Sequence, residues 1–192
     1  RDGNYALQTR ASDALLKLGP ETIPELVLLM RGPDESLGQS AAHRLARFGA
    51  AAADPVGVAL RDADVAVRVR AAGCLAEMRG DAASAWAALV TALADPEVRV
   101  RTPAAEALAT IAGRAPIGTP ALLAALKDPE PAVRCHAAVA LGRVDVRAEV
   151  AAPALIEALG DADRSVRRAA LQALPKFGRL PPAPALVRLL ED

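Results

Sequence analysis

Residues 95–108 read DPEVRVRTPAAEAL, and residues 128–141 read DPEPAVRCHAAVAL, so one pattern returns after 33 residues. Both copies have Asp first, Val-Arg at the sixth and seventh positions, Ala-Ala at the tenth and eleventh, and Leu last. The pattern recurs in residues 62–75 and 161–174. Two degenerate copies precede them at intervals of 30 residues, around 37–45 and 7–15. A period of this length over nearly the whole chain indicates a repeat architecture.

The apolar residues within each copy follow the period of an α-helix. In one copy they are Val133, Ala137, Leu141 and Val144, which fall on one face at 3.6 residues per turn. The Asp that opens each copy is expected to cap the helix, with Pro in the first turn. Pro103, inside one copy, predicts a kink or a late start with Thr102 as the cap.

A second apolar helix is expected between consecutive copies. The predicted segments are 23–30, 55–60, 84–94, 119–126, 150–159 and 184–190. Each repeat is then a first helix, a turn containing Asp, and a second helix that carries the Val-Arg pattern. A lone pair cannot bury its apolar face, whereas stacked pairs can. The prediction is a single all-α domain over 1–192, a right-handed α-α superhelix (a solenoid) of about six helical pairs.

Composition supports this fold and narrows the partners. Hydrophobic residues make up 53% of the chain and aromatics only 2%, which favours thin layers of Ala, Leu and Val. Basic and acidic residues balance in every third of the chain, so we expect no nucleic-acid partner. Cys74 and Cys135 predict free thiols in a reducing, cytoplasmic compartment. No apolar run is long enough for a membrane span. We expect a monomer, and Arg1 at the start suggests a piece of a longer chain.

The constant spacing from Asp to Arg resembles the HEAT repeat. The pairs are Asp62 and Arg68, Asp95 and Arg101, Asp128 and Arg134, and Asp161 and Arg167. The 30–33 residue period is similar to the short bacterial HEAT-like repeats known from phycobiliprotein lyases, within the armadillo-like superhelices. The resemblance implies protein binding on a concave surface lined by the second helices. Gln8 and Gly38 replace the Arg in the first two copies.

Two interpretations of the regularly spaced Arg and Asp residues compete. Four arginines in a row suit an acidic strip on a partner. Alternatively, Arg and Asp form a ladder of charge-assisted hydrogen bonds between layers, which is the interpretation we favour. It predicts that Arg101 and Arg134 contact Asp side chains or loop carbonyls of their own or adjacent layers.

The residue patterns give little support to catalysis. His43 and His136 lie far apart, and neither has a second ligand at metal-binding spacing on its helix, so no metal or cofactor is expected. No nucleophile and base are paired. HEAT-like DNA glycosylases use a basic concave face with aromatic residues, whereas the only Trp here, Trp86, lies on a first helix and therefore on the convex side. No catalytic residue is predicted.

The variable positions of the second helices, three, six and ten residues after the repeat Val, are the candidate binding positions. The expected partner-binding residues on the concave face are His43, Arg47, Arg70, Glu77, Glu106, His136 and Arg143. The predicted function is a scaffold or adaptor that binds a protein segment there. The alternative is a HEAT-like enzyme or enzyme subunit, of the lyase or DNA-glycosylase type. The change of period and the non-identical loops disfavour a designed repeat protein.

Overall fold

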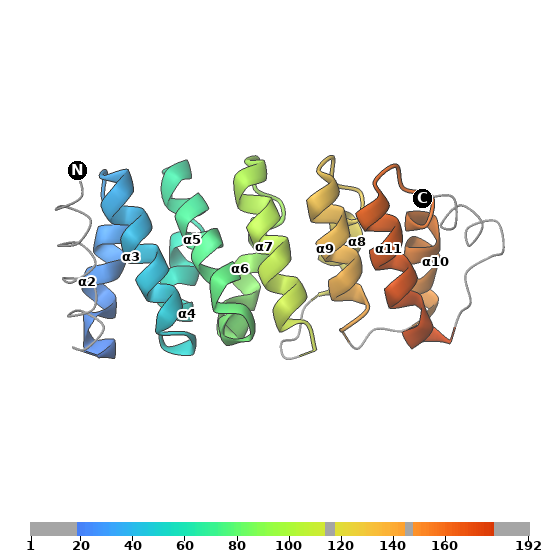
Figure 1. Ribbon diagram of the computed structural model, residues 1–192, viewed down its shortest axis with the longest axis horizontal. Helices are drawn as coiled ribbons and strands as arrows, with labels where there is room; N and C mark the ends of the chain where they lie inside the picture. The colour runs from blue at the N-terminus through green and yellow to red at the C-terminus, as the bar shows by residue number, and fades with distance from the viewer. Residues whose placement is uncertain (1–18, 114–117, 145–147, 179–192) are drawn as a thin grey trace.

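A computed structural model describes residues 19–113, 118–144 and 148–178. The α-helices alternate between two layers (Figure 1). The first helices of the repeats are α2 (Ile23–Arg31), α4 (Ala50–Ala59), α6 (Trp86–Ala92), α8 (Thr119–Ala125) and α10 (Ala148–Ala158). The second helices are α3 (Glu35–Arg47), α5 (Val65–Met78), α7 (Val98–Ile111), α9 (Pro131–Leu141) and α11 (Arg164–Ala173). Short 3₁₀ helices lie at Pro20–Thr22, Arg79–Ala85 and Leu174–Phe177.

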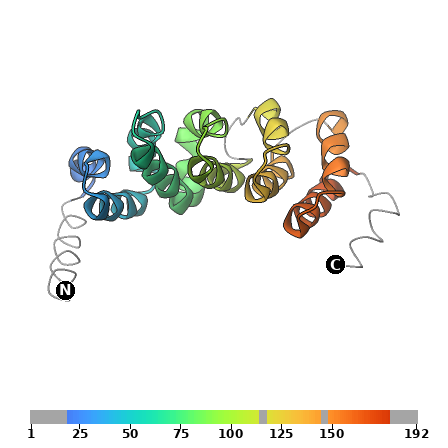
Figure 2. The same ribbon diagram turned by 90° about the horizontal axis from the view of Figure 1, so that it is seen from above.

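The two layers form a shallow arc. Seen from above, α3, α5, α7, α9 and α11 lie on its inner side, and the first helices lie on its outer side (Figure 2). The predicted all-α solenoid is confirmed, and the second helices form the concave layer as expected. The copy around residues 7–15 and the segment 184–190 lie outside the described residues.

Small side chains set the close spacing of the inner layer. The repeated Ala pairs, such as Ala71-Ala72 and Ala104-Ala105, are fully or almost fully buried. At Gly142 a Cβ atom would come within 2.8 Å of the Cβ of Ala173, so α9 and α11 meet with no room for a larger residue. The near absence of aromatics is therefore a requirement of the packing, because thin layers hold Ala, Val and Leu.

The turn aspartates do not cap their own helices, contrary to the sequence prediction. The caps lie two residues later, at Asp64 and Asp163, or at Glu97 and Glu130 without a side-chain hydrogen bond. The turn Asp instead accepts the backbone N–H two residues on, as Asp128 Oδ1 does from Glu130 at 2.8 Å. This Asx turn sets the path of the chain into the helix and leaves the other carboxylate oxygen for the neighbouring layer.

Helix boundaries show two further departures from prediction. Helix α7 starts at Val98 and continues through Pro103, so Thr102 is not a cap. Proline removes one backbone donor, and the carbonyl that loses it belongs to Arg99, an exposed residue where water can replace the bond. Helix α4 starts at Ala50, five residues before the predicted Pro55. Gly49 follows the end of α3 and Gly178 follows the last 3₁₀ helix, each with positive φ.

Candidate functional site

Charge-assisted hydrogen bonds join consecutive layers along the turn edge of the arc. Arg101 donates from Nε to Asp128 Oδ2 at 2.7 Å and from Nη2 to Oδ1 at 3.1 Å. Its Nη1 donates at 3.0 Å to the carbonyls of Asp95 and Pro96 in its own turn. One guanidinium therefore ties its own turn to the next, and such bidentate pairs are stronger than neutral hydrogen bonds.

Three of these connections have the same geometry. Arg68 binds Asp95, and Arg134 binds Asp161, with Nε–Oδ2 distances of 2.7 Å in both. Arg167 donates to the carbonyls of Asp161 and Ala162, like its counterparts. We call the set of Arg68–Asp95, Arg101–Asp128 and Arg134–Asp161 the Arg–Asp ladder. These are the contacts that the sequence analysis predicted for Arg101 and Arg134.

The ladder changes the acidity of its members. The Arg134 guanidinium lowers the pKa of Asp161 below its usual value, helped by the N–H of Asp163 and opposed by burial. The hydrogen bond to Asp128 raises the pKa of Arg101, against the effect of burial. The Arg134–Asp161 pair is thus held in its charged form. The side chains of the other two pairs are only about a tenth exposed. Each of the ladder arginines makes four hydrogen bonds within the protein.

The degenerate second repeat uses a different arrangement. Gly38 stands where the last four copies have Arg. Asp62 is bound instead by Arg31 from the end of α2, with Nη2–Oδ2 at 2.8 Å. The space beside Gly38 is filled by Arg70, whose Nε would lie 2.9 Å from a Cβ there. Arg70 donates to the carbonyls of Met30 at 2.8 Å and Gly32 at 3.2 Å.

Arg70 was expected on the partner-binding surface, and this expectation is wrong. The residue is 3% exposed and also pairs with Glu35 at 2.8 Å. The missing side chain at Gly38 opens a space into which Arg70 folds back. Sequence analysis missed both Arg31 and this role of Arg70. The signal was the loss of one Arg from the pattern and the gain of another 32 residues later, in the next layer.

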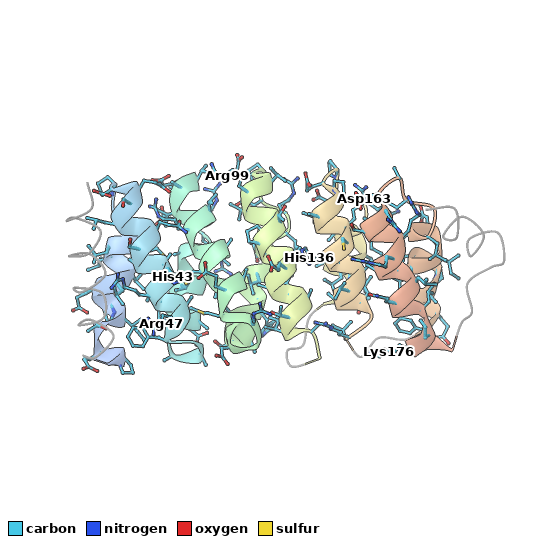
Figure 3. All side chains as sticks on the ribbon, viewed as in Figure 1. His43, Arg47, Arg99, His136, Asp163 and Lys176 are labelled. Carbon is cyan, nitrogen blue, oxygen red and sulfur yellow. The ribbon has the colours of Figure 1, made fainter. Side chains whose placement is uncertain are left out.

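The remaining predicted partner-binding residues lie on the inner face of the arc and are accessible. His43, Arg47, Glu77, Glu106 and Arg143 are exposed, and His136 is half-buried. The side chains of His43 and His136 lie near the middle of the face, and Arg47 lies nearer one end of its helix (Figure 3). The face therefore presents a shallow surface that spans all the described second helices.

Imidazole and carboxylate groups meet across neighbouring helices on this surface. His43 Nδ1 lies 2.9 Å from Glu77 Oε2, which joins α3 to α5. Burial lowers the pKa of His136, and the charge of Glu106 on α7 partly offsets this shift. The two halves of the face therefore differ, with a direct pair in one and a largely neutral imidazole in the other.

Basic side chains at the helix ends also reach the preceding layer. Arg143 Nη1 donates to the carbonyl of Ala109 at 2.7 Å, at the end of α7. Lys176 donates in the same way to the carbonyl of Val144. Cations suit the carbonyl end of a helix, where backbone acceptors lack partners. Both side chains remain exposed and so combine a packing contact with a place on the surface.

Comparison with known proteins agrees with this architecture. Residues 119–192 match the sequence model for HEAT repeats. An engineered protein of known structure superposes with a TM-score of 0.64 at 22% identity, covering 88% of this chain and 84% of that chain. The chain has the fold of the armadillo and HEAT repeat proteins.

Two further solved structures show this fold. One is a computationally designed armadillo repeat protein for modular peptide recognition, with a TM-score of 0.64, 23% identity, and coverage of 88% of this chain and 92% of that chain. The other is the complex of CpcE and CpcF of phycocyanin lyase from Nostoc sp. PCC7120, with a TM-score of 0.61, 22% identity, and coverage of 80% and 98%. No curated protein sequence matches the chain.

Two features are absent from the described residues. Within them, no three His, Cys, Asp or Glu side chains gather as metal ligands would. None of the helices in the same ranges has the length and apolarity needed to cross a bilayer.

Proposed function

We propose that the chain is a scaffold that binds a protein segment along the inner face of its arc. The observation that carries the proposal is that one set of polar residues joins the layers, whereas another set is exposed on the inner face. The ladder arginines bond mainly within the protein, whereas His43, Arg47, Glu106 and Arg143 are exposed along the second helices and the turns that follow them. In a repeat protein the positions that do not pack are available for recognition.

We further propose that the chain acts by binding and has no catalytic activity of its own. Apart from the His43–Glu77 pair, the accessible ionisable groups of the inner face are spread from α3 to the turn after α9 instead of converging on one point. Catalysis of acyl or glycosyl transfer requires such convergence, because nucleophile and base must lie within hydrogen-bonding distance. A spread surface instead suits an extended or helical segment that makes many weak contacts at once.

The test is a pull-down with the intact chain followed by charge reversal on the inner face. The triple variant Arg47→Glu, Glu106→Lys and Arg143→Glu should reduce capture of the partner at least about ten-fold, since opposed charges at several contacts add up. Its matched control carries the same net charge change on exposed positions away from that face, Arg61→Glu, Lys127→Glu and Glu157→Lys.

The control variant should capture the partner like wild type. Far-ultraviolet circular dichroism must show the same helical content in all three proteins. If the control abolishes capture and the inner-face variant does not, the binding surface is elsewhere and the proposal is wrong.

A further inference from the structure

A small hollow lies on the inner face between α9 and α11. Val139, Gly142, Arg143, Ala169, Gln172 and Ala173 line it. Its volume of about 200 Å³ is below the roughly 300–1,000 Å³ typical of small-molecule pockets. The floor is formed by apolar side chains, Val139, Ala169 and Ala173. A hollow of this size and character suits one apolar side chain of a larger partner.

The helix faces on both sides of this hollow carry cations. On α11 and the turn that follows it, Arg168, Gln172 and Lys176 stand four residues apart on one face, and all are exposed. One repeat earlier, on α9 and the turn after it, the corresponding residues are Cys135, Val139 and Arg143. His136 lies next to Cys135, and burial lowers the pKa of that His. Arg143 lines the hollow, and Arg168 and Lys176 lie four residues before and after the lining residue Gln172. These two rows contain no carboxylate.

Among the described residues, two carboxylates lie at the margins of this region. Glu106 belongs to α7, on the far side of His136. Asp163 caps α11 by accepting the N–H groups of Ser165 and Val166. Arg143 and Lys176 each give a hydrogen bond to a backbone carbonyl but keep further donors. The local charge thus differs from the neutral total of the chain and from the paired His43 and Glu77.

We infer that the hollow between α9 and α11 binds an acidic protein segment, seating one of its apolar side chains between carboxylates that contact Arg143, Arg168 and Lys176. This inference deepens the proposed function and rests on it. It fixes where on the inner face the segment is anchored and which sign of charge it carries. Complementary charge increases the rate of encounter, and the apolar side chain provides the desolvated contact.

A nucleic acid is the other ligand that clustered cations suit, and the hollow disfavours it. Proteins that bind single strands stack bases on aromatic side chains. The two rows that surround the hollow contain no Phe, Tyr or Trp. An apolar floor between the cations favours an aliphatic side chain over a phosphate. A thymidine oligonucleotide therefore serves as a competing probe in the test.

The test measures fluorescence anisotropy of a labelled peptide, Glu-Asp-Glu-Leu-Glu-Asp-Glu, titrated with the full chain. We expect binding that weakens between about 0.05 M and 0.15 M salt, since the contacts are exposed charges. The same peptide with Ser in place of Leu, and one with amides in place of the carboxylates, should each bind at least about ten-fold more weakly. Equal binding of all three peptides, or binding of none, would overturn the inference.

The deciding variant is Arg168→Glu with Gln172→Glu. Neither side chain is needed for a contact to another layer in the described structure, so the fold should persist. The dissociation constant for the acidic peptide should rise at least about ten-fold. The matched control, Ala124→Glu with Lys127→Glu, makes the same charge change on the exposed side of α8 and should bind like wild type.

Two outcomes separate this inference from the proposed function. If the partner isolated by pull-down loses binding with the Arg47, Glu106 and Arg143 reversal but tolerates Arg168→Glu with Gln172→Glu, the inner face binds and the anchor lies elsewhere. If the oligonucleotide binds and the acidic peptide does not, the cations recognise phosphate. A second variant, Arg143→Gln with Lys176→Gln, keeps a hydrogen-bond donor at both positions. It should weaken binding of the acidic peptide without lowering the melting temperature of the protein.

Discussion

Arg79 stands at a backbone position that glycine occupies in other repeats. It follows α5 with φ 53° and ψ −127°, almost the same as Gly49 after α3, with φ 56° and ψ −132°. Gly178 ends the last described repeat, again with positive φ. A side chain in this region costs about 1–3 kcal/mol, because its Cβ crowds the backbone. The chain therefore stores strain at Arg79, an exposed residue outside the proposed binding surface.

Arg79→Gly should stabilise the protein by about 1 kcal/mol. Relief of the strain outweighs the extra chain entropy of glycine, which is about 0.5–1 kcal/mol. Urea denaturation followed by circular dichroism checks the gain. Arg79→Ala is the control, because it removes the same side chain and keeps the strained Cβ. Equal stabilisation by both variants would mean that the Arg79 side chain, and not the backbone conformation, destabilises the protein.

Acid should weaken the ladder at its aspartates. The folded-state pKa of Asp161 lies below its ordinary value of 3.8, chiefly because Arg134 binds its charged form. Its contribution is therefore present above about pH 4 and is lost as pH falls through the folded pKa. Asp161→Asn should destabilise the protein at pH 7, and the difference from wild type should narrow as the pH falls below about 4. The control Asp54→Asn removes a charge from the exposed face of α4. The difference in unfolding free energy between this variant and wild type should not narrow as the pH falls. If the difference between Asp161→Asn and wild type stays constant with pH, the charge of Asp161 does not stabilise the ladder and the prediction is wrong.

Sequence patterns predicted the helices better than the contacts between them. The positions of Val133, Ala137 and Leu141 predicted a buried helical face, because helical periodicity is local in sequence. The turn Asp was interpreted as a cap, since its partner in the preceding layer is 27 residues earlier in the chain and no local rule points to it. The layer that supplies the partner of each Asp and each Arg is decided by how the repeats stack. It therefore appears only in the three-dimensional structure.

The candidate site likewise contains features that the sequence predicted and features that it did not. Exposure of His43, Glu106 and Arg143 followed from their place on the helix opposite the apolar face. Burial of Arg70 did not, because it depends on Gly38 in the neighbouring helix. The hollow between α9 and α11 likewise requires two helices that come close at Gly142. Features made by one helix were predictable, whereas features made by two were not.

Arg70 links α5 to the start of α3, so its loss should destabilise the fold and not a complex. Arg70→Met keeps the aliphatic length but leaves the carbonyls of Met30 and Gly32 without their donor. We expect a cost of about 2–4 kcal/mol, the range for breaking a buried charged hydrogen-bond network. Thermal and urea denaturation measure it, with the exposed Arg47→Met as control. If Arg70→Met retains stability but no longer binds the partner, Arg70 belongs to the partner-binding surface and its structural role is wrong.

The whole molecule is a row of layers in which each touches only its neighbours. Stability in such a stack is a sum of the intrinsic terms of each repeat and of the interfaces between repeats. The ladder and the buried Ala pairs both belong to the interfaces, so cooperativity depends on them. An interior interface matters more for cooperativity than a terminal one, because its failure divides the stack into two separate blocks.

The two cysteines lie on opposite sides of the Arg101–Asp128 pair and can report such a division. Cys74, on α5, is buried and donates to the carbonyl of Ala42, and burial raises its pKa to about 12. Cys135, on α9, is half-buried. Labelling of each thiol in a urea series, resolved by mass spectrometry of the peptides, measures unfolding of the two blocks separately.

Breaking the interior pair should separate the two transitions. In wild type both thiols should become reactive at one urea midpoint, because the interfaces couple the layers. Arg101→Met removes two hydrogen bonds to Asp128 and should cost about 2–3 kcal/mol. Cys135 should then become reactive at lower urea than Cys74, since its block contains fewer layers in the described part of the chain. Arg99→Met, two residues away and exposed, should leave the midpoints together. Coincident midpoints in Arg101→Met would mean that apolar packing alone carries the coupling and that the ladder only adds stability.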